Sequence, residues 1–248
     1  MKILAIIPAR YASTRFPAKP LADLGGQSMI KRVYTQVSKC SAITKVMVAT
    51  DHTEIANHVL AFGGSVCMTS ENHASGTDRC YEVLSKEQEL FDYVINIQGD
   101  EPFISPTQID LLASLLDGET ELATLIKKLE TQEQLINPNV VKAVINENKE
   151  AMYFSRSPIP YWRGEETDWA NQHTYYKHIG MYGYRSDILK KITSLKISSL
   201  EKAESLEQLR WLENGFKIKT AETTLETVGI DTPADLEHAL KYLKSIDA

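Results

Sequence analysis

The chain has 248 residues and a formal net charge of −6, with 43% hydrophobic and 24% charged residues. Such values are typical of a globular protein with a substantial core, and they exclude a disordered or fibrous chain. The acidic balance argues against nucleic acid as a partner, because such binders usually carry a basic face. No apolar run approaches the roughly 20 residues that span a bilayer, which argues against a membrane protein.

The first ten residues, MKILAIIPAR, place one lysine ahead of a short apolar run. This run is shorter than the about 7–15 residues of a secretory signal core, and Pro-Ala-Arg follows it. We therefore predict a first strand here and a cytoplasmic protein. Cys40, Cys67 and Cys80 are scattered and lack CxxC spacing, which favours reduced thiols over a zinc site or a disulfide framework.

Strand-like and helical patterns alternate through the first part of the chain. Strands are predicted at 2–7, 45–50, 65–69 and 92–98, and helices at 28–40, 51–64, 75–90 and 105–116. This alternation predicts an α/β fold, with a mostly parallel sheet and helices on both faces. Ligands of such sheets bind beyond the carboxyl ends of the strands.

Between about 121 and 185 few helices separate the strand-like segments. Strands are predicted at 121–129, 139–146, 151–156 and 178–185, with a long loop at 157–177. We interpret the region 121–185 as a smaller mixed β subdomain inserted into a single domain that spans 1–248. A helix at 198–215 with an S-x-x-E start, a strand at 225–231 and a capped helix at 232–246 complete the chain.

The first candidate site is the stretch IIPARYASTRFPAKPL, which follows the first strand. Arg10 and Arg15 can make bidentate contacts to phosphate, and Lys19 can act as a point charge. Ala9 and Ser13 are small and would let the backbone come close to a ligand. The P-loop pattern GxxxxGK[ST] and the dinucleotide pattern GxGxxG are both absent from the sequence. The alternative is a solvated basic loop.

Acidic residues follow two of the predicted strands. VINIQGDEPF places Asp100 at a strand end, and VGIDTPADL places Asp231 at another. Mg²⁺ binds one or two carboxylates together with phosphates and waters, so these residues suit it. Solvated acids in a turn and a simple helix start are the respective alternatives. Together with the cationic loop, the two aspartates indicate a nucleoside triphosphate with Mg²⁺.

Nine stretches in this order resemble the 3-deoxy-manno-octulosonate cytidylyltransferases, or CMP-Kdo synthetases. They are IIPARYASTRFPAKPL, VATDHTEIA, HASGTDR, NIQGDEPF, NPNVVKAV, YFSRSPIP, HIGMYGYR, ESLEQLRWLENG and GIDTPADLE. The resemblance covers nearly the whole chain and implies a Rossmann-like nucleotidyltransferase fold and a homodimer. It further implies Mg²⁺-dependent transfer of CMP from CTP to the anomeric hydroxyl of Kdo, for lipopolysaccharide biosynthesis.

The resemblance also assigns roles to residues. The catalytic residues it implies are Lys19, Asp100, Arg10 and Arg15. The nucleotide-binding residues are Ala9, Arg10, Ser13, Arg15, Lys19, Ser75, Gly76, Arg79 and Gln98, and the metal-binding residues are Asp100 and Asp231. The sugar-binding residues are Arg156, His178, Tyr184, Glu207 and Gln208.

The sugar-side residues have structural alternatives. Arg156 could be a surface arginine, His178 a packed histidine and Tyr184 a core residue. Glu204, Glu207, Gln208 and Trp211 share one face of the predicted helix, which a solvated acidic face explains about as well as hydroxyl binding.

Other functions also stay open. A cytidylyltransferase for 8-amino-Kdo or sialic acid is the nearest, and a non-catalytic nucleotide-binding protein comes from a different class. The loop RGEETDWANQ at 163–172 departs from the family pattern, so the resemblance does not assign the exact substrate contacts or the dimer details. A nicotinamide oxidoreductase is weaker, since the glycine pattern is missing.

Overall fold

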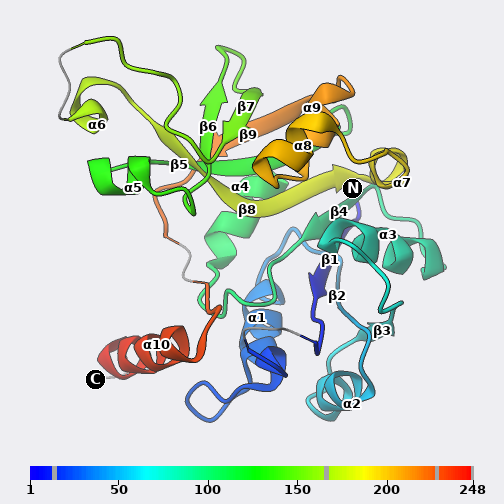
Figure 1. Cartoon of the computed structure of the whole chain (residues 1–248). Helices are drawn as coiled ribbons and strands as arrows, with labels where there is room; N and C mark the ends of the chain where they lie inside the picture. Colours follow the sequence, from blue (N-terminus) through cyan, green and yellow to red (C-terminus); the bar gives the residue numbers. More distant parts are fainter. Residues whose placement is uncertain (13–15, 165–167, 227–228, 247–248) are drawn as a thin grey trace. The chain divides into compact units, whose positions relative to one another are not determined.

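The computed structural model describes residues 1–12, 16–164, 168–226 and 229–246, and side chains up to residue 243 (Figure 1). The chain forms two compact units, Met1–Asp110 with Glu226–Ala248, and Leu111–Leu225. The predicted arrangement of a single domain with an insertion at about 121–185 stays a prediction. Within the described ranges, no helix is both long and apolar enough to cross a bilayer.

A parallel sheet forms the centre of the first unit. Its strands are β1 (Ile3–Pro8), β2 (Lys45–Thr50), β3 (Val66–Met68) and β4 (Tyr93–Asn96). Their order is β3-β2-β1-β4, with every pair parallel. β1 is buried along nearly its whole length, as expected of a central strand that is covered on both faces.

The strand order determines on which face of the sheet the helices between the strands lie. They are η1 (Lys19–Leu21, a 3-10 turn), α1 (Met29–Val37), α2 (Thr53–Ala61), α3 (Gly76–Lys86) and α10 (Pro233–Ile246). The chain moves from β1 to β2 and β3 in one direction and then returns past β1 to β4. Because such crossovers are right-handed, α3 lies on the face opposite α1 and α2, and Figure 1 shows α1 and α3 on either side of β1. The crevice at the carboxyl ends of β1 and β4 is therefore the expected ligand site.

The second unit contains a mixed sheet and short helices. Its strands are β5 (Leu122–Lys128), β6 (Lys142–Ile145), β7 (Ala151–Ser155), β8 (Tyr176–Arg185) and β9 (Ile218–Glu222). β5 pairs antiparallel with β8 and parallel with β9, while β6 pairs antiparallel with β7 and β8. The helices are α5 (Gln132–Ile136), α6 (Trp169–Gln172), α7 (Ser186–Thr193), α8 (Ser199–Glu204) and α9 (Gln208–Glu213), and α4 (Pro106–Ala113) leads in from the first unit. The predicted α/β class with a smaller mixed sheet is confirmed.

An irregularity interrupts the pairing of β5 with β8. Thr124 pairs with Tyr182, whereas the next residue, Leu125, pairs with Ile179. The register between the two strands therefore shifts at Gly180 and Met181. Such bulges bend a strand and change the direction of its side chains.

Two predicted elements near the C-terminus are wrong. The described residues of 225–231 form no strand, and the last strand is β9 instead, where alternating Ile218 and Thr220 are buried. The helix predicted over 198–215 is broken into α8 and α9 at Ser205, which has a φ of 52°. Arg156 explains the break, because its guanidinium donates to the carbonyl oxygens of Glu204 and Ser205 and so takes the place of the next helical turn.

Candidate active site

A pocket of about 280 Å³ lies at the carboxyl ends of β1 and β4, within the first unit. Its lining residues are Pro8, Ala9, Arg10, Lys19, Pro20, His73, Ala74, Ser75, Gly76, Arg79, Gln98, Gly99, Asp100 and Asp231. It collects every described residue of the predicted nucleotide-binding and metal-binding sets. Ser13 and Arg15 lie outside the described residues.

Close contact between two strand ends forms the floor of the pocket. A Cβ on Gly99 would lie 2.6 Å from the carbonyl oxygen of Pro8, so a side chain at this position does not fit. The Ala9 N–H donates to the carbonyl of Ala49 over 2.8 Å and holds the end of β1 against β2. The turn after β4 thus meets the loop after β1 backbone to backbone.

The loop after β1 closes on itself before it reaches Lys19. The Ala18 N–H donates to the carbonyl of Tyr11 over 3.1 Å, and Ala18 has a left-handed backbone with φ 55°. Lys19 follows as the first residue of η1, so a short rigid turn carries it. Arg10, at the other end of the loop, is exposed at the edge of the pocket.

Lys19 joins the two predicted metal ligands. Its Nζ lies 2.7 Å from Asp100 Oδ2 and 3.1 Å from Asp231 Oδ1, and its side chain is only 15% exposed. The two aspartates meet because the Ile230 N–H donates to the carbonyl of Asp100 over 2.9 Å. The described residues of the strand predicted over 225–231 form no strand, and Asp231 reaches the site from the segment ahead of α10 instead.

These two carboxylates fit a divalent cation. They supply hard oxygen ligands, and Mg²⁺ commonly takes one or two such ligands and completes its shell with waters and phosphates. The Lys19 ammonium between them shows that the geometry already accommodates positive charge. Among the described residues no group of three or more His, Cys, Asp or Glu forms a metal cage. Glu101 lies beside Asp100, and burial together with the charge of Asp100 raises the pKa of its carboxyl to about 7.

The N-terminus of α3 forms another wall of the pocket. Ser75 is the N-cap: its Oγ accepts from the Asp78 N–H at 3.1 Å and donates to Asp78 Oδ2 at 2.9 Å. The Ser75 hydroxyl is therefore occupied within the helix. The N-terminus of α3 itself can bind the anionic groups of a nucleotide, because it carries a partial positive charge.

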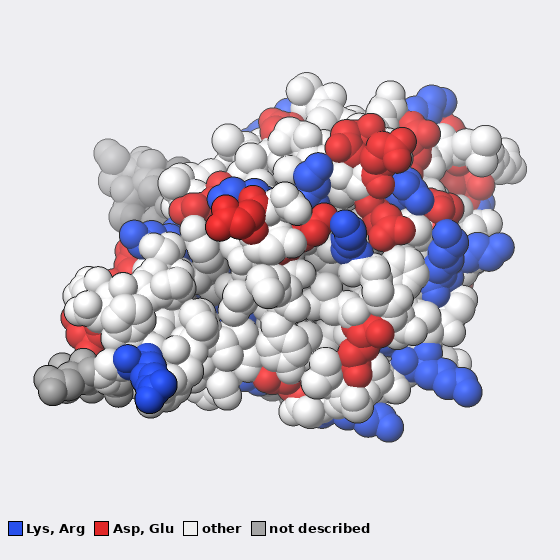
Figure 2. All heavy atoms as spheres, turned by 90° about the horizontal axis from the view of Figure 1, so that it is seen from above, with Lys and Arg blue, Asp and Glu red and all other residues white. Residues whose placement is uncertain are grey.

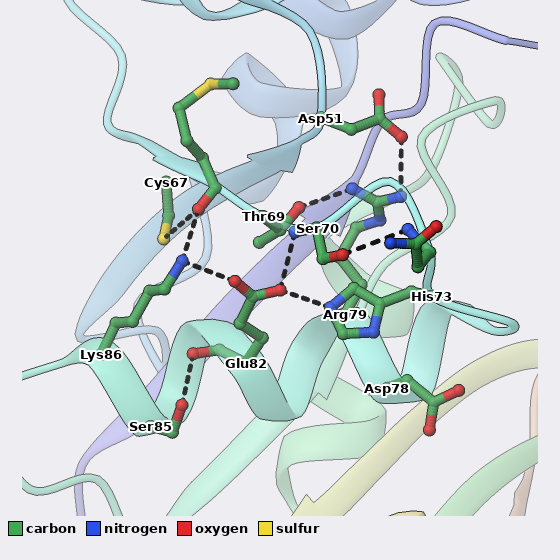
Figure 3. A network of polar contacts seen from close by, with 12 residues as sticks. Asp51, Cys67, Thr69, Ser70, His73, Asp78, Arg79, Glu82, Ser85 and Lys86 are labelled. Carbon is green, nitrogen blue, oxygen red and sulfur yellow. Dashed lines mark hydrogen bonds and ion pairs between the residues drawn. The ribbon is translucent and has the colours of Figure 1, made fainter.

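Arg79, in the first turns of α3, is tied into a polar network that Figure 3 shows from close by. Its guanidinium donates to Thr69 Oγ1 at 2.5 Å and to Asp51 Oδ2 at 2.8 Å, and only 5% of its side chain is exposed. The other oxygen of Asp51 accepts from the Tyr11 N–H at 3.3 Å. Asp51 thus connects the loop after β1 with the arginine of α3. Sequence reasoning missed it, although it directly follows the buried β2, the same signal that identified Asp100.

The same network includes His73, which also lines the pocket. His73 Nε2 contacts Glu82 Oε2, and Glu82 also accepts from the Ser70 N–H at 2.8 Å and from Lys86 Nζ at 2.5 Å. Burial would raise the pKa of Glu82, but these hydrogen bonds outweigh it and lower the pKa to about 2. His73 was missed as well, although it begins the quoted stretch HASGTDR.

The predicted sugar-binding residues all lie in the second unit. Arg156 is committed to backbone oxygens: its guanidinium donates to Glu204 O at 2.8 Å, Pro138 O at 3.1 Å and Ser205 O at 3.4 Å. The Glu204 carboxylate in turn accepts from Ser155 Oγ and the Arg156 N–H. Glu204 therefore organises the end of β7 and is not part of a solvated acidic face.

Lys142 supports the neighbouring loop. Its side chain is fully buried, and its Nζ donates to the carbonyl oxygens of Asn137, Val140 and Arg156. Burial lowers the pKa of this ammonium. The stretch NPNV is thus wrapped around an internal cation.

His178 and Tyr184 belong to a row of rings on one face of β8. His178 contacts Phe154 and Tyr182, and Trp211 of α9 packs edge-on against Tyr182 and Tyr184. Tyr184 is completely buried, whereas His178 is partly exposed. The structure therefore brings His178 and Tyr184 into one packed cluster.

Glu207 and Gln208 begin α9, after the break at Ser205. Glu207 Oε1 accepts from Arg210 Nη2 at 3.1 Å, and Gln208 is buried. The predicted common face of Glu204, Glu207, Gln208 and Trp211 is wrong, because Glu204 belongs to α8 and the other three to the separate helix α9 and its N-cap.

One face of the molecule is drawn with its charged side chains coloured (Figure 2). On the face drawn in Figure 2, acidic and basic side chains of the described residues are interspersed and neither sign forms a continuous stripe. A basic stripe typical of nucleic-acid binders is not present on this face.

Comparison with known proteins identifies the family. A model of the cytidylyltransferase family matches residues 4–240. The 3-deoxy-manno-octulosonate cytidylyltransferase of Cytophaga hutchinsonii is 59% identical over 95% of each chain, and that of Parabacteroides distasonis is 57% identical over 98% of each. A solved structure of CMP:2-keto-3-deoxy-manno-octonic acid synthetase complexed with CTP superimposes with a TM-score of 0.93, at 42% identity, covering 99% of this chain and 100% of that one. The chain therefore belongs to the cytidylyltransferase family.

Proposed function

We propose that the protein transfers CMP from CTP to the anomeric hydroxyl of 3-deoxy-D-manno-octulosonate (Kdo), giving CMP-Kdo and pyrophosphate. The observation that carries the proposal is the triad of Lys19, Asp100 and Asp231 in the pocket at the ends of β1 and β4. High identity to enzymes of that name, over nearly the whole chain, supports the same substrates.

In this reaction the anomeric oxygen attacks the α-phosphorus of CTP. A new P–O bond forms, the bond to the β-phosphate breaks, pyrophosphate leaves and the hydroxyl proton is released. Lys19 and Arg10 lie where the triphosphate would be received after β1, and they stabilise the negative charge that grows on the leaving pyrophosphate. Arg15 is assigned the same role from the sequence.

Asp100 and Asp231 would hold Mg²⁺. When bound, Mg²⁺ supplies positive charge that orients the α-phosphate and lowers the pKa of the attacking hydroxyl. Both carboxylates accept hydrogen bonds from Lys19, whose ammonium would turn away from them when the site is occupied. Lys19 is then available to the triphosphate.

The nucleotide side of the site is assigned to Ala9, Ser75, Gly76, Arg79 and Gln98, and the sugar side to Arg156, His178, Tyr184, Glu207 and Gln208. Asp51 holds Arg79 against the loop after β1, so the arginine keeps its place before a ligand arrives. This part of the proposal rests on the resemblance and on the contacts described above. A homodimer, a cytoplasmic location and a role in lipopolysaccharide biosynthesis belong to it on the same basis.

The test is pyrophosphate release by the purified protein with CTP, Mg²⁺ and Kdo. Release is expected only when all three are present. UTP in place of CTP, omission of Mg²⁺, and 8-amino-Kdo or sialic acid in place of Kdo are the control reactions. Turnover with a variant sugar alone would keep the chemistry and change the substrate. If a folded protein that binds CTP releases no pyrophosphate in any of these reactions, the proposal is contradicted and a non-catalytic nucleotide-binding protein is favoured.

A further inference from the structure

The hydroxyl of Thr124 occupies the bulge between β5 and β8. Thr124 is completely buried, and its Oγ1 lies 2.8 Å from the carbonyl oxygen of Met181 and 3.1 Å from that of Ile179. A third neighbour, His178 Nε2, lies 3.0 Å away. The bulge at Gly180 and Met181 is what turns these two carbonyls toward one side chain.

The donors and acceptors of this group can be assigned from chemistry. A threonine hydroxyl has one hydrogen to donate, and carbonyl oxygens only accept. Its hydrogen therefore points to one of the two carbonyls, Met181 being the closer. The contact with His178 then has to run the other way, from Nε2–H to Thr124 Oγ1. A hydroxyl turned toward Nε2 would give up its hydrogen bonds to the two carbonyls of these buried residues, which is unfavourable.

This assignment determines the state of the imidazole. A neutral histidine carries its proton on one nitrogen only, so a ring with Nε2–H has a lone pair on Nδ1. Burial lowers the pKa of His178 to about 3, which keeps the ring neutral at pH 7. Contacts with Phe154 and Tyr182 fix the plane of the ring. Within the described part of the chain, Nδ1 has no hydrogen-bond partner.

We propose that Thr124 is a positioning residue that holds His178 in the Nε2–H tautomer and leaves Nδ1 as an acceptor for a hydroxyl of the sugar acid. The contact with the sugar acid rests on the proposed function, whereas the assignment of the tautomer does not. His178 contributes selection of a hydroxyl donor, and it does not act as a base in the transfer step.

The direct measurement is a long-range ¹H–¹⁵N spectrum of the imidazoles at pH 7, with the His178 signals assigned by their loss in His178→Gln. The expected pattern for His178 is a protonated Nε2 and an unprotonated Nδ1. A protonated Nδ1 in the unsubstituted protein would overturn the inference without any threonine variant and whatever the activity proves to be.

Variants then test the role of the hydroxyl. Thr124→Val keeps the shape of the side chain and removes the hydroxyl, while Thr124→Ser keeps the hydroxyl. We expect the valine variant to lose the pure Nε2–H pattern and to raise KM for Kdo about tenfold, the equivalent of one lost hydrogen bond, with KM for CTP unchanged. The serine variant should restore both the spectrum and KM for Kdo.

Thr220→Val is the matched control. Thr220 is the register partner of Thr124 on β9, is buried, and donates to the carbonyl of Lys149 at 2.9 Å. It loses a similar hydroxyl from the same sheet and should change neither the His178 spectrum nor KM for Kdo. An unchanged tautomer and an unchanged KM for Kdo in Thr124→Val would contradict the proposal. If the unsubstituted protein fails to turn over CTP with Kdo, the proposed function fails while the tautomer assignment is still decided by the spectrum.

Discussion

The two regions that hold the predicted site residues are organised by different forces. In the pocket of the first unit, opposite charges hold one another: Lys19 lies between Asp100 and Asp231, and Arg79 pairs with Asp51. In the ring cluster of the second unit, His178, Tyr184 and Trp211 are held by packing and by neutral hydrogen bonds. A ligand of the first region has to replace internal ion pairs, whereas a ligand of the second meets groups whose positions are already set.

This difference predicts how each region responds to substitution. Removing a charge from the pocket removes a group that the proposed reaction uses, so the effects on turnover or on KM for CTP should be large. Removing a polar atom from the ring cluster should cost little unless that atom has a partner. The following variants test the contrast, beginning with the largest expected effect.

Asp100→Asn should reduce kcat on the order of 100- to 1,000-fold, because it removes negative charge from the proposed metal site. The melting temperature should change little, since Lys19 retains Asp231 as a partner. Steady-state pyrophosphate release and calorimetry measure the two quantities. Normal turnover in this variant would remove Asp100 from the metal site.

Asp51→Asn should raise KM for CTP about 10- to 100-fold, the equivalent of losing one hydrogen bond to a charged group, about 1.5–3 kcal/mol. KM for Kdo should stay nearly constant, because the hydrogen bonds of Asp51 to other described residues are with Tyr11 and Arg79, on the nucleotide side. Asp187→Asn is the control: Asp187 also pairs with an arginine, Arg185, but 53% of its side chain is exposed. Equal effects of the two substitutions on KM for CTP would show that the Asp51–Arg79 pair has no specific role in CTP binding.

Tyr182→Phe should raise the free energy of unfolding by about 1 kcal/mol, because a buried hydroxyl without a partner costs about that much. Within the described residues the Tyr182 hydroxyl is buried and has no hydrogen-bond partner. Tyr175→Phe is the matched control, since the Tyr175 hydroxyl donates to the carbonyl of Pro160 at 3.0 Å and its loss should destabilise the fold. Urea unfolding gives both values, and a clear loss of stability in Tyr182→Phe would mean that this cluster has a polar bond like those of the pocket.

The smallest effect is expected for Glu82→Gln, which should lower the free energy of unfolding near neutral pH and lose this effect in acid. The pKa of Glu82 is about 2 in the folded protein, below the ordinary value of 4.5. The stabilisation from its ionised form is therefore complete above pH 4.5 and is lost as the pH falls toward 2. The free energy of unfolding should fall less steeply between pH 6 and pH 3 in this variant than in Glu130→Gln, which removes an exposed carboxylate. Parallel slopes for the two variants would place the pKa shift of Glu82 in doubt.

The sequence analysis predicted the first unit more fully than the second. Alternating buried strands and amphipathic helices have distinct periodicities, so β1 to β4 and the residues at their carboxyl ends could be located from pattern alone. The break at Ser205 could not be located, because Ser198–Gly215 is helical by pattern and the cause is Arg156, about fifty residues away. Asp231 was placed at the end of a strand that the described residues of 225–231 do not form, and its position depends on a backbone hydrogen bond between Ile230 and Asp100.

Side-chain partners were also beyond sequence reasoning. Thr124 gave no signal at all, since a threonine in a strand is ordinary and only the bulge of β8 gives its hydroxyl a special place. Asp51 was visible as a residue after a strand, but its pairing with Arg79 depends on how β2 and α3 pack. Local pattern locates candidate positions, and tertiary contacts decide what each of them does.

Lys142 gives the second unit an internal counterpart of a structural calcium ion. Its ammonium gathers the carbonyl oxygens of Asn137, Val140 and Arg156, as a cation in a binding loop does, but it is covalently attached and cannot dissociate. A chelator that strips divalent ions from the pocket therefore leaves this loop intact. In an enzyme whose proposed chemistry uses an exchangeable metal, the scaffold beside the sugar-binding residues keeps its shape at any metal concentration.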